Sequence, residues 1–279
     1  MATTAITAAN ITNMIPALTS LKIKATYEPK LVSAKWTDRR FEADLKYGDT
    51  VDVPNISSLT PNAVNVDADE TSNDILQNLD QIIINQWYTT PIRFGDMHRI
   101  QLIPTAMAAF IEKCAAGTAK QMDTSVNALY ASFTNSVGTD NTALTPDVLI
   151  EEYETLNEND VPEDGRVWIF DPESITDLLK YDVFIKSSYV PEGVMSKGFT
   201  GREILGAPVF WTSNLAALNT TYHSAAYLQK DAIALITQMA PLVEQYPWKE
   251  RHSIVVRSTA LWGVKLMRAT SGVHIKTRS

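Results

Sequence analysis

The longest regular pattern of apolar residues runs from Pro104 to about Thr134 and predicts one long helix. Its apolar positions fall mostly three or four residues apart, which lines one face of a helix: Met107, Phe110, Ile111, Cys114, Met122, Val126, Leu129, Tyr130 and Phe133. Pro104 suits a first helical turn, and Gly138 lies just beyond the end. At 1.5 Å per residue such a helix would be about 46 Å long, which suits an elongated subunit.

Between residues 36 and 53 the period changes to two, which predicts a two-stranded hairpin. Apolar and charged side chains alternate over residues 41–47, and Gly48 with Asp49 supplies a turn. Because a lone hairpin is marginally stable, we expect its apolar side to rest on its own domain or on another copy. The candidate contact residues are Trp36, Arg39, Arg40, Phe41, Leu45, Tyr47 and Gly48.

The rest of the chain mixes strand and helix patterns, so the expected fold class is α+β. Residues 77–94 form a long β-rich run that leads into the long helix. Thr145 and Pro146 open a second helix, residues 166–170 read as a strand, and Asp171 caps a short helix. Strands follow at 204–212, 225–228, 232–237, 254–257, 261–268 and 273–276.

Composition narrows the class of protein. Of 279 residues, 45% are apolar and 20% are charged, which is ordinary for one large or two small folded domains. We expect a cytoplasmic protein, because no apolar run approaches the roughly 18 residues of a membrane span and no signal-peptide pattern opens the chain. The single cysteine, Cys114, falls on the apolar face of the long helix and is expected to be buried.

Charge is unevenly distributed along the chain. The net charge of -8 argues against a protein that grips nucleic acid by neutralising phosphates. Residues 140–182 carry 13 acids against Arg166 and Lys180, whereas residues 249–279 carry seven Lys and Arg against Glu250 alone. Either an acidic face of one copy meets a basic edge of another, or the two are unrelated solvated faces.

Catalytic motifs are absent from the sequence. There is no phosphate-binding glycine loop, no nucleophile elbow and no zinc-binding histidine pair. The four histidines are far apart, so hydrogen-bonded or surface roles are expected for them: His98, His223, His252 and His274. We therefore expect no catalytic residue, no cofactor and no metal site.

Four stretches, in this order and spacing, carry a resemblance to a known family: residues 46–54, 159–172, 203–210 and 261–268. With the uncharged first 20 residues and the long helix, they make the chain resemble the major capsid protein of tailed bacteriophages, the Hong Kong 97-type fold. The resemblance implies an N-terminal arm at 1–34, an extended β-hairpin loop at 35–75, a peripheral domain at 76–139 and 236–279 with a spine helix at 104–134, and an axial domain at 140–235.

The resemblance also implies the function and the partners. Copies of the chain would join as hexamers and pentamers into an icosahedral head shell that encloses double-stranded DNA without sequence-specific binding and without a membrane. It would assemble in the host bacterial cytoplasm, with a separate scaffolding protein, a portal and a decoration protein as partners, and would end up in the virion.

Two alternatives stay open. The same fold could form an encapsulin-like compartment or a gene-transfer particle. The cargo or nucleic acid inside purified particles would distinguish these from a phage head. A soluble α+β hydrolase is the second, with residues 187–200 as a lid over the acidic middle of the chain. The enzyme hypothesis predicts a cleft that holds clustered carboxylates with perturbed pKa values.

Overall fold

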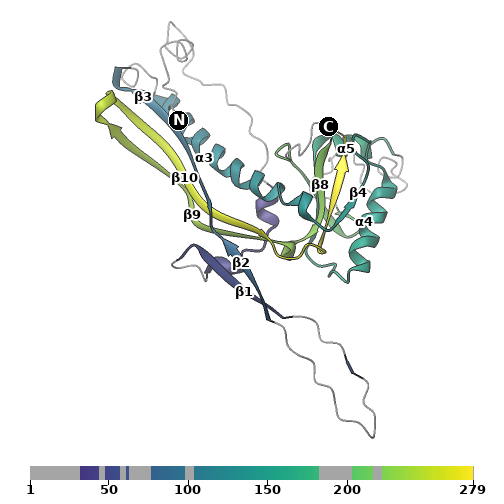
Figure 1. Ribbon diagram of the computed structural model, residues 1–279. Helices are drawn as coiled ribbons and strands as arrows, with labels where there is room; N and C mark the ends of the chain where they lie inside the picture. The colour runs from purple at the N-terminus through teal and green to yellow at the C-terminus, as the bar shows by residue number, and fades with distance from the viewer. Residues whose placement is uncertain are drawn as a thin grey trace.

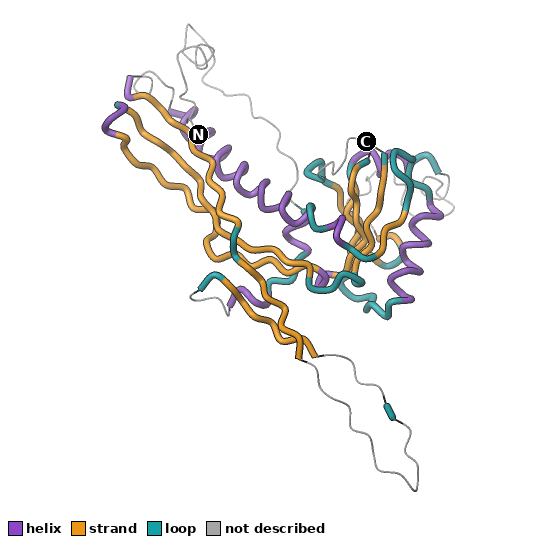
Figure 2. The backbone as a smooth tube through the Cα atoms, in the orientation of Figure 1, coloured by secondary structure: helices purple, strands orange, loops and turns teal. Residues whose placement is uncertain are grey.

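The computed structural model describes residues 32–43, 48–56, 61–62, 77–97, 104–181, 203–215 and 222–278. Within these residues the chain forms an elongated body, a compact body beside it, and a two-stranded hairpin that projects from their junction (Figures 1 and 2). The predicted α+β class is confirmed.

The elongated body consists of one long helix lying along a three-stranded antiparallel sheet (Figure 1). The helix α3 spans Pro104–Asn127, and the sheet has the order β3 (Gln86–Gly95), β10 (Ser253–Leu266) and β9 (Ile233–Trp248). The Phe110 ring of α3 lies 5.4 Å from the Phe94 ring of β3. The predicted long helix is thus confirmed, although it ends at Asn127 because Tyr130–Ser132 turns as a 3-10 helix into the compact body.

The compact body is built on a six-stranded sheet. Its order is β4 (Asn135–Val137), β11 (Gly272–Thr277), β8 (His223–Gln229), β5 (Arg166–Phe170), β7 (Ala207–Trp211) and β6 (Glu203–Ile204). Two helices, α4 (Pro146–Glu158) and α5 (Pro172–Leu178), belong to this body. Its mostly aliphatic core contains an aromatic stack, in which the Trp168 ring lies 3.7 Å from Tyr227 and 5.6 Å from Phe170.

Local signals placed several of these elements correctly. Pro146 opens α4, and the Asp171 carboxylate accepts hydrogen bonds from the backbone N–H groups of Glu173 and Ser174 at the start of α5. Residues 166–170 form the buried strand β5. The predicted strands 254–257 and 261–268 are parts of a single strand, β10, which runs past an irregularity near Leu261.

The position of the hairpin was predicted wrongly. Its strands are β1 (Thr50–Ile56) and β2 (Gln77–Ile83), which pair antiparallel, and Arg40–Ala43 forms a 3-10 helix in place of the expected first strand. The alternation at 41–47 misled because the backbone N–H and side chain of Arg40 bind Asp38, which curls the chain. Leu45 and Tyr47 lie outside the described residues.

Strand pairing also differs from the predicted division of the chain. β4 and β11 fall in the segments assigned to the peripheral domain, yet they pair with each other and β11 pairs with β8 in the compact body. β2 falls in the same assignment but belongs to the hairpin. Nearly all of the predicted arm, residues 1–34, and the predicted lid, residues 187–200, lie outside the described residues.

Candidate assembly surfaces

Most of the predicted contact residues that the structure describes bind their own chain. The Trp36 ring lies 5.2 Å from the ring of Phe210, and Phe41 packs against an apolar cluster that the hairpin base forms with β9. Arg39 is exposed, although its Nη2 group donates a hydrogen bond to the backbone oxygen of Ala34. A contact with another copy through these side chains stays a prediction.

Arg40 holds the segment before the hairpin by two ion pairs. Its guanidinium Nη2 lies 2.7 Å from Asp38 Oδ2 and 3.2 Å from Asp231 Oδ2. Burial raises the pKa of Asp38, but the hydrogen bonds and charge of Arg40 outweigh it, so the pKa of Asp38 is lowered overall. Asp38 therefore stays ionised, and the cluster fixes this segment beside β9.

The base of the hairpin crosses β10 at very close range. A Cβ atom at Gly263 would lie 2.5 Å from the carbonyl oxygen of Ile83 and 3.0 Å from the Cα atom of Ile84. Only a glycine allows this approach. Nearby, Gln238 Nε2 donates a 3.0 Å hydrogen bond to the carbonyl oxygen of Gly48, which tethers the first strand to β9.

The two faces of the hairpin differ in burial. Ile82 is fully buried in a small apolar cluster against which Val51 and Val53 pack. On the opposite face Leu79 is 67% exposed and Ile83 is 49% exposed. Large exposed apolar side chains on a projecting hairpin are typical of a surface that another molecule covers. Sequence reasoning missed both residues; the polar pair at Asn85 and Gln86, which divides the β-rich run 77–94, was the available signal.

A groove of about 590 Å³ lies between the hairpin base, α3 and the sheet. Its lining mixes uncharged polar side chains with apolar ones such as Ile83, Leu129 and Val264, and its one charged residue, Lys265, pairs with Asp80 at 3.4 Å. A smaller hollow of about 110 Å³ contains Asp38 and Asp231 around Arg40, the ion-paired cluster already described.

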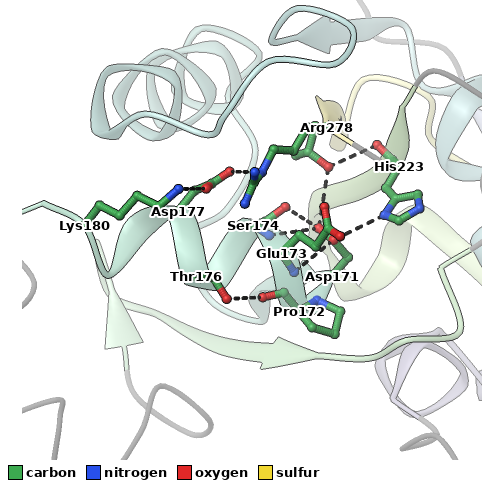
Figure 3. A network of polar contacts seen from close by, with 10 residues as sticks. Asp171, Pro172, Glu173, Ser174, Thr176, Asp177, Lys180, His223 and Arg278 are labelled. Carbon is green, nitrogen blue, oxygen red and sulfur yellow. Dashed lines mark hydrogen bonds and ion pairs between the residues drawn. The ribbon is translucent and has the colours of Figure 1, made fainter.

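The C-terminal end of β11 is fastened to α5 by a polar network (Figure 3). Buried Asp177 forms ion pairs with Lys180 Nζ at 2.7 Å and with Arg278 Nε at 2.8 Å. Asp171, the cap of α5, also lies 3.3 Å from His223 Nδ1. The network ties residues distant in sequence into one body, which is a structural role.

Three ionisable groups whose pKa values are shifted by burial lie on three different elements: Glu152 on α4, Asp123 on α3 and His274 on β11. Burial raises the pKa of Glu152 well above its usual value. Burial also raises the pKa of Asp123, whose carboxylate accepts a hydrogen bond from the backbone N–H of Ala34. Burial lowers the pKa of His274 to about 4 within hydrogen bonds to Ser224 and Ser136. None of these groups lines either groove.

Among the described residues no three His, Cys, Asp or Glu side chains gather as metal ligands would. Over the same ranges, no helix combines the length and apolar character needed to cross a membrane.

Comparison with known proteins defines the fold. No protein-family model matches the sequence, and no curated protein matches it. Among solved structures, a chain of Mycobacterium phage Che8 is similar with a TM-score of 0.81 at 19% identity, over 94% of this chain and 97% of that one. The capsid structure of the cyanophage P-SCSP1u follows with a TM-score of 0.74 at 14% identity, over 96% of this chain and 94% of that one.

A third similar structure is the capsid of a native GTA particle, with a TM-score of 0.68 at 10% identity over 100% of both chains. These matches span nearly the whole chain, so they concern the entire architecture and no isolated motif. The chain has the fold of phage capsid proteins. The resemblance read from the sequence is therefore confirmed at the level of the fold.

Proposed function

We propose that this chain is the major capsid protein of a tailed phage, which assembles from many copies into an icosahedral shell around double-stranded DNA. The observation that carries the proposal is the match of the whole chain to phage capsid structures, at TM-scores of 0.74 and 0.81 for the two described first. The role is structural and not catalytic, and the protein's place is the virion after assembly in the host cytoplasm.

The shape of the subunit supports self-assembly. A flat elongated body and a projecting hairpin cannot bury as much of their own surface as a sphere of equal mass. The hairpin carries Leu79 and Ile83 on its uncovered face, where a neighbouring copy would bury them. Hexamers and pentamers use such heterologous contacts, in which one surface meets a different surface of the next copy.

The domain roles follow from this proposal. The elongated body is the peripheral domain with α3 as the spine helix, the compact body is the axial domain, and β1 with β2 is the extended loop. A scaffolding protein, a portal and a decoration protein are the further partners expected of such a shell.

A gene-transfer particle is the second candidate, because the capsid of a native GTA particle matches the full length of both chains. The nuclease-protected DNA inside purified particles separates the two candidates. A phage head holds copies of one genome, whereas a gene-transfer particle holds assorted fragments of the producing cell's DNA.

The hairpin provides a direct test of assembly. Leu79→Asp places a charge on its exposed face, so we expect a folded subunit that forms at least tenfold fewer closed shells by negative-stain microscopy. Leu205→Asp is the matched control, because Leu205 is also exposed but lies in a turn of the compact body. Normal shells from Leu79→Asp would contradict the role given to the hairpin.

A further inference from the structure

In the elongated body, α3 lies on one face of the sheet, the covered face, and the hairpin base crosses the opposite face at Gly263. Beyond this crossing, towards the turn between β9 and β10, no element of the described residues covers the opposite face (Figure 1). On the covered face, the hydroxyl of Thr90 lies 3.1 Å from that of Thr118 on α3. Side chains alternate along a strand, so Trp87 and Arg93 lie on the opposite face. Trp87 is 72% exposed there, the largest exposed fraction among the exposed apolar side chains of the described residues.

The pairing register continues this uncovered face across all three strands. Arg93 pairs with Val255, which pairs with Tyr246, and one row further on Arg257 pairs with Glu244. We call this surface the arginine face; its defining residues are Trp87, Arg93, Tyr246, Trp248, Arg251 and Arg257.

Arginines on this face lie over aromatic rings. The guanidinium carbons of Arg93 and Arg251 lie 5.8 Å and 5.0 Å from the ring centre of Trp248, and that of Arg257 lies 5.1 Å from Tyr246. The acid within the face, Glu244, is already bound to Arg257, with Oε2 2.9 Å from Nη2. Exposed Trp, Tyr and Arg in one patch form the composition that protein interfaces favour.

The helix α4 presents the opposite charge. Four of its five acids fall four, three and four residues apart and are exposed along one side of the helix: Asp147, Glu151, Glu154 and Glu158. The fifth, Glu152, is buried, and the helix has no lysine or arginine. Like charges at this spacing destabilise a helix. Within the described ranges no cation forms an ion pair with any of the four, and Ile150, 57% exposed, lies beside them. We call the four exposed acids and Ile150 the acidic stripe.

The two surfaces cannot meet within one subunit. α4 lies on the compact body, while the turn between β9 and β10 that ends the arginine face lies at the far end of the elongated body (Figures 1 and 2). The acidic stripe is short enough to lie within the length of the arginine face, because the 13 residues of α4 are about 20 Å long and the ten residues of β3 are about 33 Å long.

We propose that the arginine face of one copy binds the acidic stripe of α4 on a second copy. The inference rests on the proposed function and names the two surfaces of one heterologous contact in the shell. The two surfaces are complementary in charge. One has arginines over aromatic rings, and the other has carboxylates that pair with no cation of the described residues, beside an exposed isoleucine. The net charge of -8 favours a second copy over nucleic acid as the occupant.

The test reverses the charge of each side separately and then of both. Arg93→Glu with Arg251→Glu changes the arginine face, and Glu151→Lys with Glu154→Lys changes the acidic stripe. Each double variant places like charges across the contact, so we expect at least tenfold fewer closed particles by sedimentation and microscopy. The fourfold variant restores opposite charges, so we expect it to assemble within about twofold of wild type.

Co-expression of the two double variants is a second experiment, whose result does not depend on whether the fourfold variant folds. Contacts between unlike variants pair glutamate with lysine or arginine with glutamate, so mixed particles are expected although neither variant assembles alone. Lys120→Glu with Glu203→Lys is the control, because both residues are exposed and lie outside the two surfaces.

Three outcomes would overturn the inference. If the double variants assemble normally while wild type assembles, the contact is wrong and the proposed function stands. If only Arg93→Glu with Arg251→Glu matters, and its particles form but retain duplex DNA less well in a salt titration, the face binds nucleic acid. If wild type itself forms no particles, the proposed function fails and this inference with it.

Discussion

Gly263 shows how a single residue determines the attachment of the hairpin. Because a Cβ atom there would lie 2.5 Å from the carbonyl oxygen of Ile83, Gly263→Ala must push the hairpin away from β10. We expect a loss of about 1–3 kcal/mol in the free energy of unfolding, measured by urea denaturation.

Gly117→Ala is the matched control for Gly263→Ala. A Cβ atom at Gly117 would meet Thr90 at an ordinary 3.5 Å inside α3, so we expect no loss of stability there and a gain of up to about 1 kcal/mol. Equal unfolding midpoints for the two variants would contradict the close crossing.

His274 makes stability depend on pH. Burial lowers its pKa to about 4, from 6.5 in the unfolded chain, so below pH 6.5 the unfolded state binds a proton that the folded state does not. The contribution of neutral His274 to the free energy of unfolding is complete above pH 6.5. It is lost progressively as the pH falls towards 4, by at most about 3 kcal/mol. Thermal unfolding of wild type and His274→Asn from pH 4 to pH 8 measures this, and an equal pH slope for both would refute it.

At the scale of elements, the C-terminal strand depends on the short helix α5. Buried Asp177 pairs with both Arg278 and Lys180, so Asp177→Asn leaves two cations without their carboxylate (Figure 3). We expect a loss of about 1–3 kcal/mol in the free energy of unfolding. Glu173→Gln on the same helix is the control, since Glu173 is exposed and should change stability by less than about 1 kcal/mol. Equal losses for both variants would argue against the network.

Elements with local signals were predictable from sequence, and long-range pairings were not. Pro104, Pro146 and Asp171 marked helix starts that the structure confirms. The hairpin was missed because β1 and β2 are separated by the 20 residues 57–76, so no short window contains both strands. The pairing of β11 with β8 joins residues some 50 positions apart, and periodicity carries no information about it.

The candidate surfaces were also predictable only in part, since local charge was visible in the sequence and long-range pairing was not. Uneven charge along the sequence pointed to a basic end and an acidic middle, but only strand register places Arg93 beside Tyr246 and Trp248 on one face. The seven contact residues predicted around the misplaced hairpin include Trp36 and Phe41, which pack against their own chain. Their contact with another copy stays a prediction.

At the scale of the whole molecule, the long helix α3 makes the subunit elongated. An elongated subunit leaves surfaces that other copies of the chain can cover. Among the described residues, three surfaces have no intramolecular partner: the arginine face of the sheet, the exposed side of the hairpin with Leu79, and the acidic stripe of α4. Copies of the same chain can complete all three at once, as subunits of a closed shell do.

The most direct measurement is electron microscopy, with sedimentation velocity, of the wild-type protein, expressed alone and together with the scaffolding protein proposed above. The account predicts closed particles with icosahedral symmetry, in which the hairpin of each subunit lies on a neighbour. A compact monomer at every concentration and ionic strength, with the hairpin folded against its own body, would contradict it.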